Sequence, residues 1–180
     1  MSYEKFTKPA AHNSKVVIKK DGKEYGNIFT ETPLGILSIS AYIKKYTSVE
    51  TKLIDFNVML NEVDSFTFDS FDSYYMSNLS NIDFEPDIIC ISMLFTNMYL
   101  NGIAMGFCCR YLFPNAQIVA GGAVATNMYE DIFRDCSYFD ALCFGEGEIP
   151  VLTLLLDNNF NNRSWITQEK LQNTFTPEYS

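Results

Sequence analysis

The regular alternation of short apolar runs with segments of helical periodicity limits the fold more than any other feature. Residues 88–92 form an apolar run without polar alternation, which is typical of a strand covered on both faces. Two more runs, at 116–122 and 138–145, predict strands, and helical patterns follow the three runs at 97–112, 127–135 and 149–157. Strands that alternate with helices at short spacing predict βαβ units and a parallel sheet.

The helical pattern at 97–112 also predicts which side chains face the sheet. Its apolar residues recur at helical spacing and are expected to form one buried stripe: Leu100, Ile103, Ala104, Phe107, Cys108 and Tyr111.

The first half of the chain gives weaker signals. Residues 15–19 predict a short first strand, and residues 49–56 predict a second strand ending near Asp55. Between them, residues 33–46 predict a helix with Pro33 in its first turn and apolar side chains over most of its surface, so we expect it to be largely buried. A weak helix is expected between Ser70 and Ser80.

Composition and charge narrow the class of protein. The hydrophobic share of 47% is that of a folded domain, and 180 residues are enough for a substantial core. With 13 basic and 22 acidic residues, the net charge of -9 argues against a nucleic-acid partner, because such binding relies on Lys and Arg displacing counterions. The acidic stretch 61–87 is interpreted as a solvated face.

Targeting signals and cysteine spacing point to an intracellular protein. The sequence shows no secretory signal pattern and no apolar run of membrane-spanning length, so we expect a cytoplasmic protein without a membrane partner. The five cysteines are odd in number, lie mostly in apolar runs and include no C-x-x-C pair, which favours buried thiols.

Candidate site residues follow from the predicted sheet, because ligands of open parallel sheets bind beyond the carboxyl ends of the strands. Ser92 and Thr96 offer hydroxyls after the strand at 88–92. Glycines there allow close approach of a ligand to the backbone, and helix N-termini favour negative charge. Glycines and acids of this kind follow the next two strands, at Gly121 and Gly122 and at Gly145, Glu146, Gly147 and Glu148; a tight turn and a helix cap explain them equally well.

Five segments taken together resemble the N-terminal cobalamin-binding domain of B12-dependent radical SAM enzymes. They are "TPLGILSISAYIKKY", "VETKLIDFN", "PDIICISMLFTN", "AQIVAGGAVAT" and "FDALCFGEGEIPVLTLL", and the resemblance covers about residues 15–157. It implies a flavodoxin-like (Rossmann-like) α/β fold, a three-layer sandwich in which helices cover both faces of a five-stranded parallel sheet. The corrin would lie over the carboxyl ends of the strands.

The resemblance also implies site residues. "SML" matches the family's S-x-L motif, with the serine hydroxyl near the dimethylbenzimidazole; the glycine pair would let the nucleotide tail pass; and "GEGE" matches a signature of the radical SAM branch. The implied cofactor-binding residues are Ser92, Met93, Leu94, Thr96, Gly121, Gly122, Ala123, Gly145, Glu146, Gly147 and Glu148.

One departure concerns the lower face of cobalt. Cobalamin proteins of the methionine-synthase kind carry D-x-H-x-x-G after the first strand, and its histidine is the lower ligand. The nearest string here is "DGKEYG", with Lys23 in place of the histidine, and a protonated amine has no lone pair for a metal. The single histidine, His12, precedes the first predicted strand. We therefore expect no protein side chain on cobalt and no other metal site.

A second departure concerns catalysis. No C-x-x-x-C-x-x-C spacing exists among the five cysteines, so this chain by itself cannot hold the cluster that radical chemistry needs. An iron–sulfur cluster and S-adenosylmethionine are expected only in a downstream radical SAM domain, acting in cis or in trans, with methyl transfer or carbon rearrangement as the reaction. The expected division is an N-terminal arm at 1–14, the cobalamin-binding domain at 15–157 and a polar tail or linker at 158–180.

Two other functions remain open at this stage. The first is a flavodoxin-like domain without a cofactor that acts as an interaction or scaffolding surface. The second is a nucleotide- or flavin-binding domain, which we rank last because no G-x-G-x-x-G follows the first predicted strand.

Overall fold

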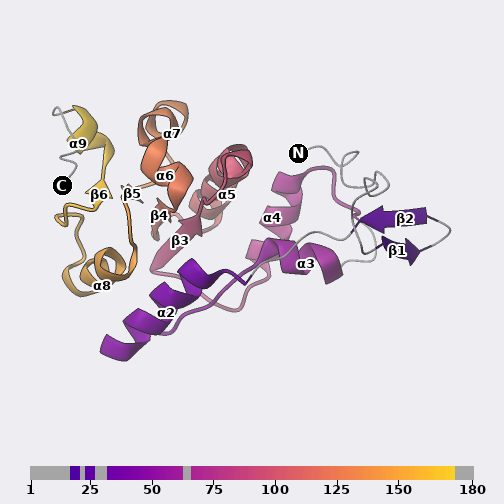
Figure 1. The fold of residues 1–180 in the computed structure, drawn as a ribbon, viewed down its shortest axis with the longest axis horizontal. Helices are drawn as coiled ribbons and strands as arrows, with labels where there is room; N and C mark the ends of the chain where they lie inside the picture. Colours follow the sequence, from indigo (N-terminus) through magenta and orange to yellow (C-terminus); the bar gives the residue numbers. More distant parts are fainter. Residues whose placement is uncertain (1–16, 21–22, 27–31, 63–65, 173–180) are drawn as a thin grey trace. The chain divides into compact units, whose positions relative to one another are not determined.

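The computed structural model describes residues 17–20, 23–26, 32–62 and 66–172. The chain divides into two compact units, the first formed by Met1–Thr32 with Lys52–Asn81 and the second by Pro33–Thr51 with Ile82–Ser180 (Figure 1). The expected arm at 1–14, including His12, lies outside the described residues. Each unit is described separately below.

The described part of the first unit contains a β-hairpin and two helices. Strands β1 (Val17–Lys20) and β2 (Lys23–Gly26) pair antiparallel, with Val17 opposite Gly26. The predicted first strand therefore exists from Val17 onward, but its partner is the neighbouring segment and not a parallel sheet. Helix α4 (Phe71–Ser80) confirms the weak helix, and the Ser70 hydroxyl caps it by accepting the Ser73 amide at 3.1 Å.

The predicted second strand at 49–56 is wrong. Residues 49–55 have no regular secondary structure, and helix α3 (Phe56–Glu62) begins where the strand was expected to end. The Asp55 carboxylate accepts the amides of Asn57 and Val58 at 3.0 and 3.2 Å. The residue interpreted as the end of a strand is thus a helix N-cap, since its oxygen satisfies amides that lack partners in the first turn.

The second unit is built on a four-stranded, mostly parallel sheet. Its order is β3 (Ile88–Ser92), β4 (Gln117–Gly121), β5 (Ala141–Cys143) and β6 (Trp165–Ile166). The first three strands are parallel and confirm the predicted strands at 88–92, 116–122 and 138–145, while β6 runs antiparallel to β5. A five-stranded parallel sheet is not seen in the part of the chain that the structure describes, because neither strand predicted from the first half of the chain joins β3 there.

Helices lie on both faces of this sheet. Figure 1 shows α2 (Leu34–Tyr46) and α8 (Glu148–Asp157) on one face and α5 (Tyr99–Leu112), α6 (Ala123–Asn127) and α7 (Tyr129–Asp135) on the other. The 3-10 turn η1 (Thr96–Met98) leads into α5, and α9 (Gln168–Gln172) follows β6. On the α2 and α8 face, one hydrophobic cluster contains Ile43, Val119, Ala141, Cys143, Val151, Leu154 and Trp165.

Helix α5 uses a different face from the one predicted. Leu100 and Tyr111, expected in the core, are 72% and 68% exposed, whereas Gly102 and Gly106 are buried. A Cβ at Gly102 would lie 2.5 Å from the Met93 side chain, and one at Gly106 would lie 2.8 Å from the Phe139 ring. The glycines are buried because large side chains from the segments after β3 and before β5 fill the space beside them. Of the predicted stripe, Cys108 alone is fully buried among the side chains that the structure describes.

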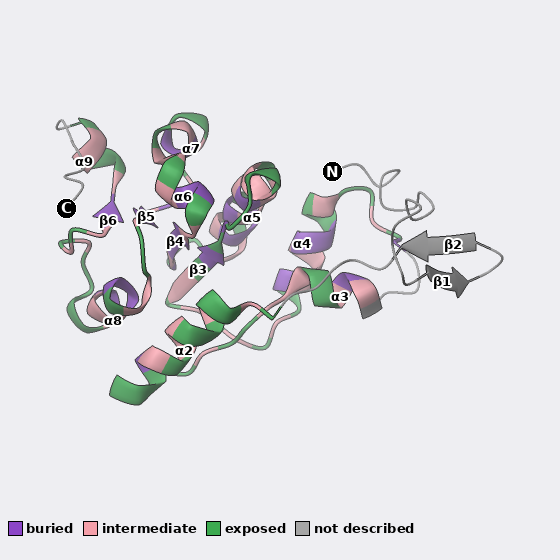
Figure 2. Ribbon diagram, in the orientation of Figure 1, coloured by how far each residue is buried: buried purple, intermediate pink, exposed green. Residues whose placement is uncertain are grey.

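Helix α2 is much less buried than expected. Ile43 is its buried residue within the described part of the chain, and Leu34 is 72% exposed. Figure 2 shows exposed and intermediate residues along most of α2, in contrast to the buried strands β4 to β6. The apolar residues around this helix therefore predicted more burial than the structure shows.

The chain after Asp157, expected to be a polar tail, returns to the sheet. Trp165 and Ile166 form β6 and are fully buried. The Lys170 ammonium donates to the carbonyl oxygens of Phe160, Asn162 and Trp165 at 2.7, 3.3 and 2.8 Å, which closes the loop before β6. Trp165 and Ile166 thus belong to the core of the second unit.

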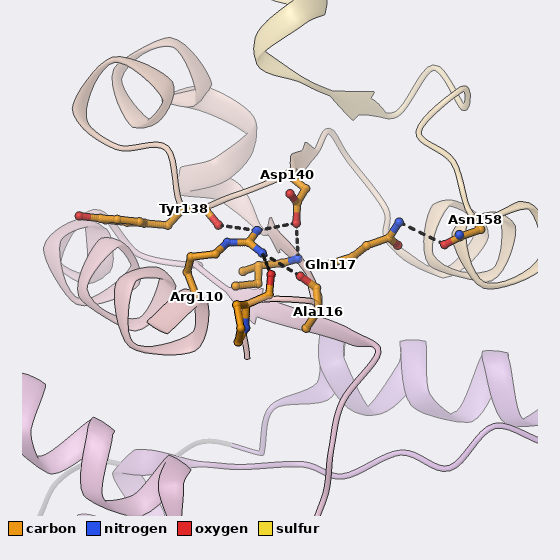
Figure 3. A network of polar contacts seen from close by, with 8 residues as sticks. Arg110, Ala116, Gln117, Tyr138, Asp140 and Asn158 are labelled. Carbon is orange, nitrogen blue, oxygen red and sulfur yellow. Dashed lines mark hydrogen bonds and ion pairs between the residues drawn. The ribbon is translucent and has the colours of Figure 1, made fainter. Parts of the chain in front are cut away.

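A polar cluster holds the amino ends of β4 and β5 (Figure 3). The Arg110 guanidinium donates to the Asp140 carboxylate at 2.7 Å and to the carbonyl oxygens of Ala116 and Tyr138 at 3.0 and 3.1 Å. The same Asp140 oxygen accepts the Ile118 amide at 2.7 Å. Helix α5 and two strands are therefore joined by charge-assisted hydrogen bonds. We call this group the Arg110 cluster.

In the described part of the chain, no helix combines the length and the apolar content needed to span a bilayer.

Candidate functional site

The predicted site residues lie at the carboxyl ends of three neighbouring strands. We call this region the carboxyl edge and define it as residues 92–96, 121–126 and 145–148. Ser92 and Gly121 are register partners in β3 and β4, and a Cβ at Gly121 would lie 3.6 Å from the Cys143 Cβ in β5. The structure therefore brings the three predicted loops together along one edge of the sheet.

The loop after β3 alternates between solvent and core. Ser92 is exposed and Leu94 is 49% exposed, but Met93 between them is fully buried. The Met93 amide donates to the Gly121 carbonyl at 2.8 Å, and its own carbonyl accepts the Val124 amide at 2.9 Å. Met93 is thus a core residue that holds this loop, whereas Ser92, Leu94 and the exposed Thr96 are accessible to a ligand.

The two glycines at the end of β4, Gly121 and Gly122, lack a side chain for different structural reasons. Gly122 has φ of 98°, and a Cβ there would lie 2.8 Å from the Met93 carbonyl oxygen. Its lack of a side chain is therefore required by the protein's own backbone. A Cβ at Gly121 would meet the Cys143 Cβ alone, at an ordinary contact distance. Gly121 leaves space at the edge, and the exposed Ala123 begins α6 beside it.

The Gly145–Glu148 loop also divides into two halves. Gly145 has φ of 77°, nothing lies within 4 Å of a Cβ built on it, and both it and Glu146 are exposed. In the second half, a Cβ at Gly147 would lie 2.7 Å from the Ile39 side chain, and Glu148 accepts the Ser38 hydroxyl at 2.7 Å. Gly147 and Glu148 therefore seat α2 against α8, while Gly145 and Glu146 face open space.

Electrostatics at this edge affect the thiol that lies beside it. Burial, together with the nearby carboxylates of Glu148 and Glu146, raises the pKa of the Cys143 thiol to about 11. This shift favours the protonated thiol, which is a weaker nucleophile than the thiolate. The edge has two carboxylates and no Lys or Arg, which disfavours a polyphosphate such as that of a nucleotide cofactor.

No protein metal site is evident in the described residues. They contain no group of three His, Cys, Asp or Glu side chains that could hold a metal ion. His12 lies outside the described residues, and Lys23 lies in β2 of the first unit. The expectation that no side chain ligates cobalt stays a prediction.

A shallow hollow of about 310 Å³ lies between α7 and α9, away from the predicted site residues. Its lining is partly apolar and partly charged: Glu130, Phe133, Arg134, Gln168, Leu171 and Gln172. The exposed Arg134 is already paired with Asp131 and Asp135, at 2.6 and 3.2 Å. None of the predicted site residues lines this hollow, so it gives no support to a cobalamin site.

Sequence reasoning missed two contributors to the carboxyl edge. Thr126 in α6 contacts the Gly145–Glu148 loop through its hydroxyl, and α2 reaches the same loop through Ser38 and Ile39. Thr126 lies one helical turn after Gly122. A hydroxyl at that spacing could have indicated a residue that contacts the carboxyl edge. The contact from α2 depends on how the helix packs and has no local signal.

Comparison of the chain with protein-family models, with curated proteins and with solved structures finds no match in any of the three.

Proposed function

We propose that this chain provides a cobalamin-binding module for a B12-dependent radical SAM protein. The observation that carries the proposal is the combination of Ser92, Gly121 and Gly145 at one edge of a mostly parallel sheet. Both glycines leave space where a side chain would otherwise project, and ligands of such sheets bind at this edge. The resemblance of the motifs to cobalamin-binding domains supports the same assignment.

The fit of the residues to cobalamin is partial. The accessible groups that would hold it are the Ser92 hydroxyl, the Leu94 side chain, the backbone at Gly121 and Gly145, and the exposed Thr96, Ala123 and Glu146. Among the described residues, no side chain or backbone group hydrogen-bonds to the Ser92 hydroxyl, which leaves it free for a ligand. Met93, Gly122, Gly147 and Glu148 serve internal packing instead, so we do not assign them direct contacts.

Cobalamin, when bound, would supply the chemistry of a methyl carrier, and the protein would supply position and exclusion of water. The sequence has no cysteine triplet for an iron–sulfur cluster. S-adenosylmethionine and that cluster would therefore belong to a catalytic partner domain, which would also choose the substrate.

A scaffold function is the second candidate, because the structure gives it one specific support. The outer face of α5 exposes Leu100, Phe107 and Tyr111, the last of these by 68%. A helix that is apolar on both sides is usually covered on both. This face fits a protein-binding domain that needs no cofactor.

The test is retention of a corrin. The purified chain is mixed with hydroxocobalamin, desalted and examined by absorption spectroscopy, and we expect a retained corrin spectrum. Gly121→Val should abolish retention, because its branched side chain would fill the space at the edge. Gly121→Ala is the matched control for folding, since its Cβ has one neighbour at an ordinary distance.

Circular dichroism and thermal unfolding show whether each variant folds. No retained corrin in the wild-type protein contradicts the proposal and favours the scaffold function. Full retention by a folded Gly121→Val protein would show that the ligand binds elsewhere.

A further inference from the structure

One hydroxyl joins the two glycine-containing loops of the carboxyl edge. Thr126 lies in α6, which starts directly after Gly122. Its Oγ1 accepts the Gly145 amide at 3.3 Å and lies 3.5 Å from the Cys143 carbonyl oxygen, to which it donates. A single side chain therefore uses both its donor and its acceptor on the end of β5.

This contact acts where the backbone has little other support. The Gly145 amide has Thr126 as its acceptor among the described residues, and Gly145 itself is exposed with φ of 77°. The rest of the loop is held by other groups: the Phe144 amide donates to the Ser164 carbonyl at 2.7 Å, the Glu146 carbonyl accepts the Cys143 thiol at 3.8 Å, and Glu148 accepts the Ser38 hydroxyl. Gly145 is thus the point of the loop whose position depends on Thr126.

We infer that Thr126 is a positioning residue for the ligand site. Its hydroxyl sets the spacing between the loop at Gly121 and Gly122, where α6 begins, and the loop at Gly145 and Glu146. The inference rests on the proposed function, since the ligand is the cobalamin proposed above. Thr126 does not itself need to touch the ligand, because it acts through the Gly145 backbone.

The alternative is a purely structural role in which the hydroxyl stabilises the fold and leaves the site unchanged. Two variants separate the roles. Thr126→Val removes the hydroxyl from a half-buried side chain of nearly the same shape, and Thr126→Ser keeps the hydroxyl. Thr153→Val is a matched control, because the half-buried Thr153 hydroxyl donates to the Ile149 and Pro150 carbonyls of its own helix and accepts the Asn162 side-chain amide at 3.4 Å, and none of these partners is Gly145 or a residue of α6.

The first measurement needs no ligand. Hydrogen exchange of the Gly145 amide is followed by NMR in the full chain. Thr126→Val should accelerate it by about two- to tenfold, the range expected for loss of one ordinary hydrogen bond, while Thr126→Ser and Thr153→Val should leave it near the wild-type rate. Unchanged exchange in Thr126→Val overturns the inference, whether or not the protein binds a corrin.

The second measurement is the dissociation constant of hydroxocobalamin by absorption titration. We expect Thr126→Val to weaken binding by about two- to tenfold, with binding restored in Thr126→Ser and unchanged in Thr153→Val. Faster exchange with unchanged affinity also overturns the inference, since the loop would then move without effect on the ligand. If the wild-type protein binds no corrin, the proposed function fails, and the positioning of this ligand fails with it.

Discussion

The two edges of the sheet in the second unit are held in different ways. At the amino edge, the Arg110 cluster joins α5, β4 and the residue before β5 through side-chain hydrogen bonds, with the Arg110 side chain largely shielded at 28% exposure (Figure 3). At the carboxyl edge, backbone groups make most of the contacts, as between Met93 and Gly121, and glycines replace side chains.

The difference shows how one sheet can separate stability from binding. The Arg110 and Asp140 side chains at the amino edge hydrogen-bond to other groups of the protein, so they are unavailable to a ligand. The carboxyl edge is fixed with few side chains, which leaves Ser92, Leu94 and Gly145 accessible. Loops held by their backbone can present an open surface without losing their position.

The largest expected effect comes from the paired glycines. Gly122→Ala should lower the free energy of unfolding by about 2–4 kcal/mol, because a Cβ at φ of 98° is strained and would also meet the Met93 carbonyl at 2.8 Å. Gly121→Ala should cost far less, since its Cβ has an ordinary contact. Urea unfolding of the two variants measures the difference. Equal midpoints would mean that the carboxyl edge does not depend on backbone contact at Gly122.

A smaller effect is expected at the amino edge. Asp140→Ala should lower the free energy of unfolding by about 1–2 kcal/mol, because the Ile118 amide and the Arg110 guanidinium lose a shared acceptor that is partly exposed. Asp140→Asn should lose less stability than Asp140→Ala, because the side-chain oxygen of Asn can still accept the hydrogen bond of one amide. Corrin retention should be unchanged in both variants if they fold; a loss of retention would contradict the separation of the two edges.

The smallest effect is expected at a surface contact outside both edges. The Tyr99 hydroxyl donates to the Asp135 carboxylate at 2.8 Å, and this hydrogen bond, with the neighbouring Arg134, lowers the pKa of Asp135. A lowered folded-state pKa adds stability above the unfolded value of about 3.9, and that stability is lost as the pH falls through the folded value.

Asp135→Asn should therefore lower the melting temperature slightly at neutral pH, by an amount that disappears in strong acid. Thermal unfolding of the variant and the wild-type protein at neutral and acid pH measures this. A difference that grows as the pH falls would reverse the assigned direction of the shift.

Strong local patterns predicted the second half of the chain well. The strands β3, β4 and β5 and the helices that follow them lie close to their predicted positions, because continuous apolar runs and helical spacing are local properties. Asp55 shows where such patterns fail. The segment 49–55, with Val49, Leu53 and Ile54, suits a strand that ends at Asp55, but the Asp55 carboxylate caps α3 instead. The local sequence is compatible with both outcomes.

Helix α5 shows a second limit. Periodicity selected its large apolar residues as the buried face, whereas the structure buries Gly102 and Gly106 there. The deciding factor is the size of two side chains that flank the strands: Met93 after β3 and Phe139 before β5 occupy the space, so only glycine fits opposite them. A helix that is apolar on every side carries no signal for that choice.

The sequence by itself determined the alternation of strands and helices in the second unit and the grouping of its glycine-containing loops after consecutive strands. These follow from short-range patterning and from the geometry of parallel connections. Tertiary structure alone decided which glycines face open space and which are filled, which side of α5 is buried, and that β6 completes the sheet. Each of these depends on atoms from segments distant in the chain, whose contacts form only when the core packs.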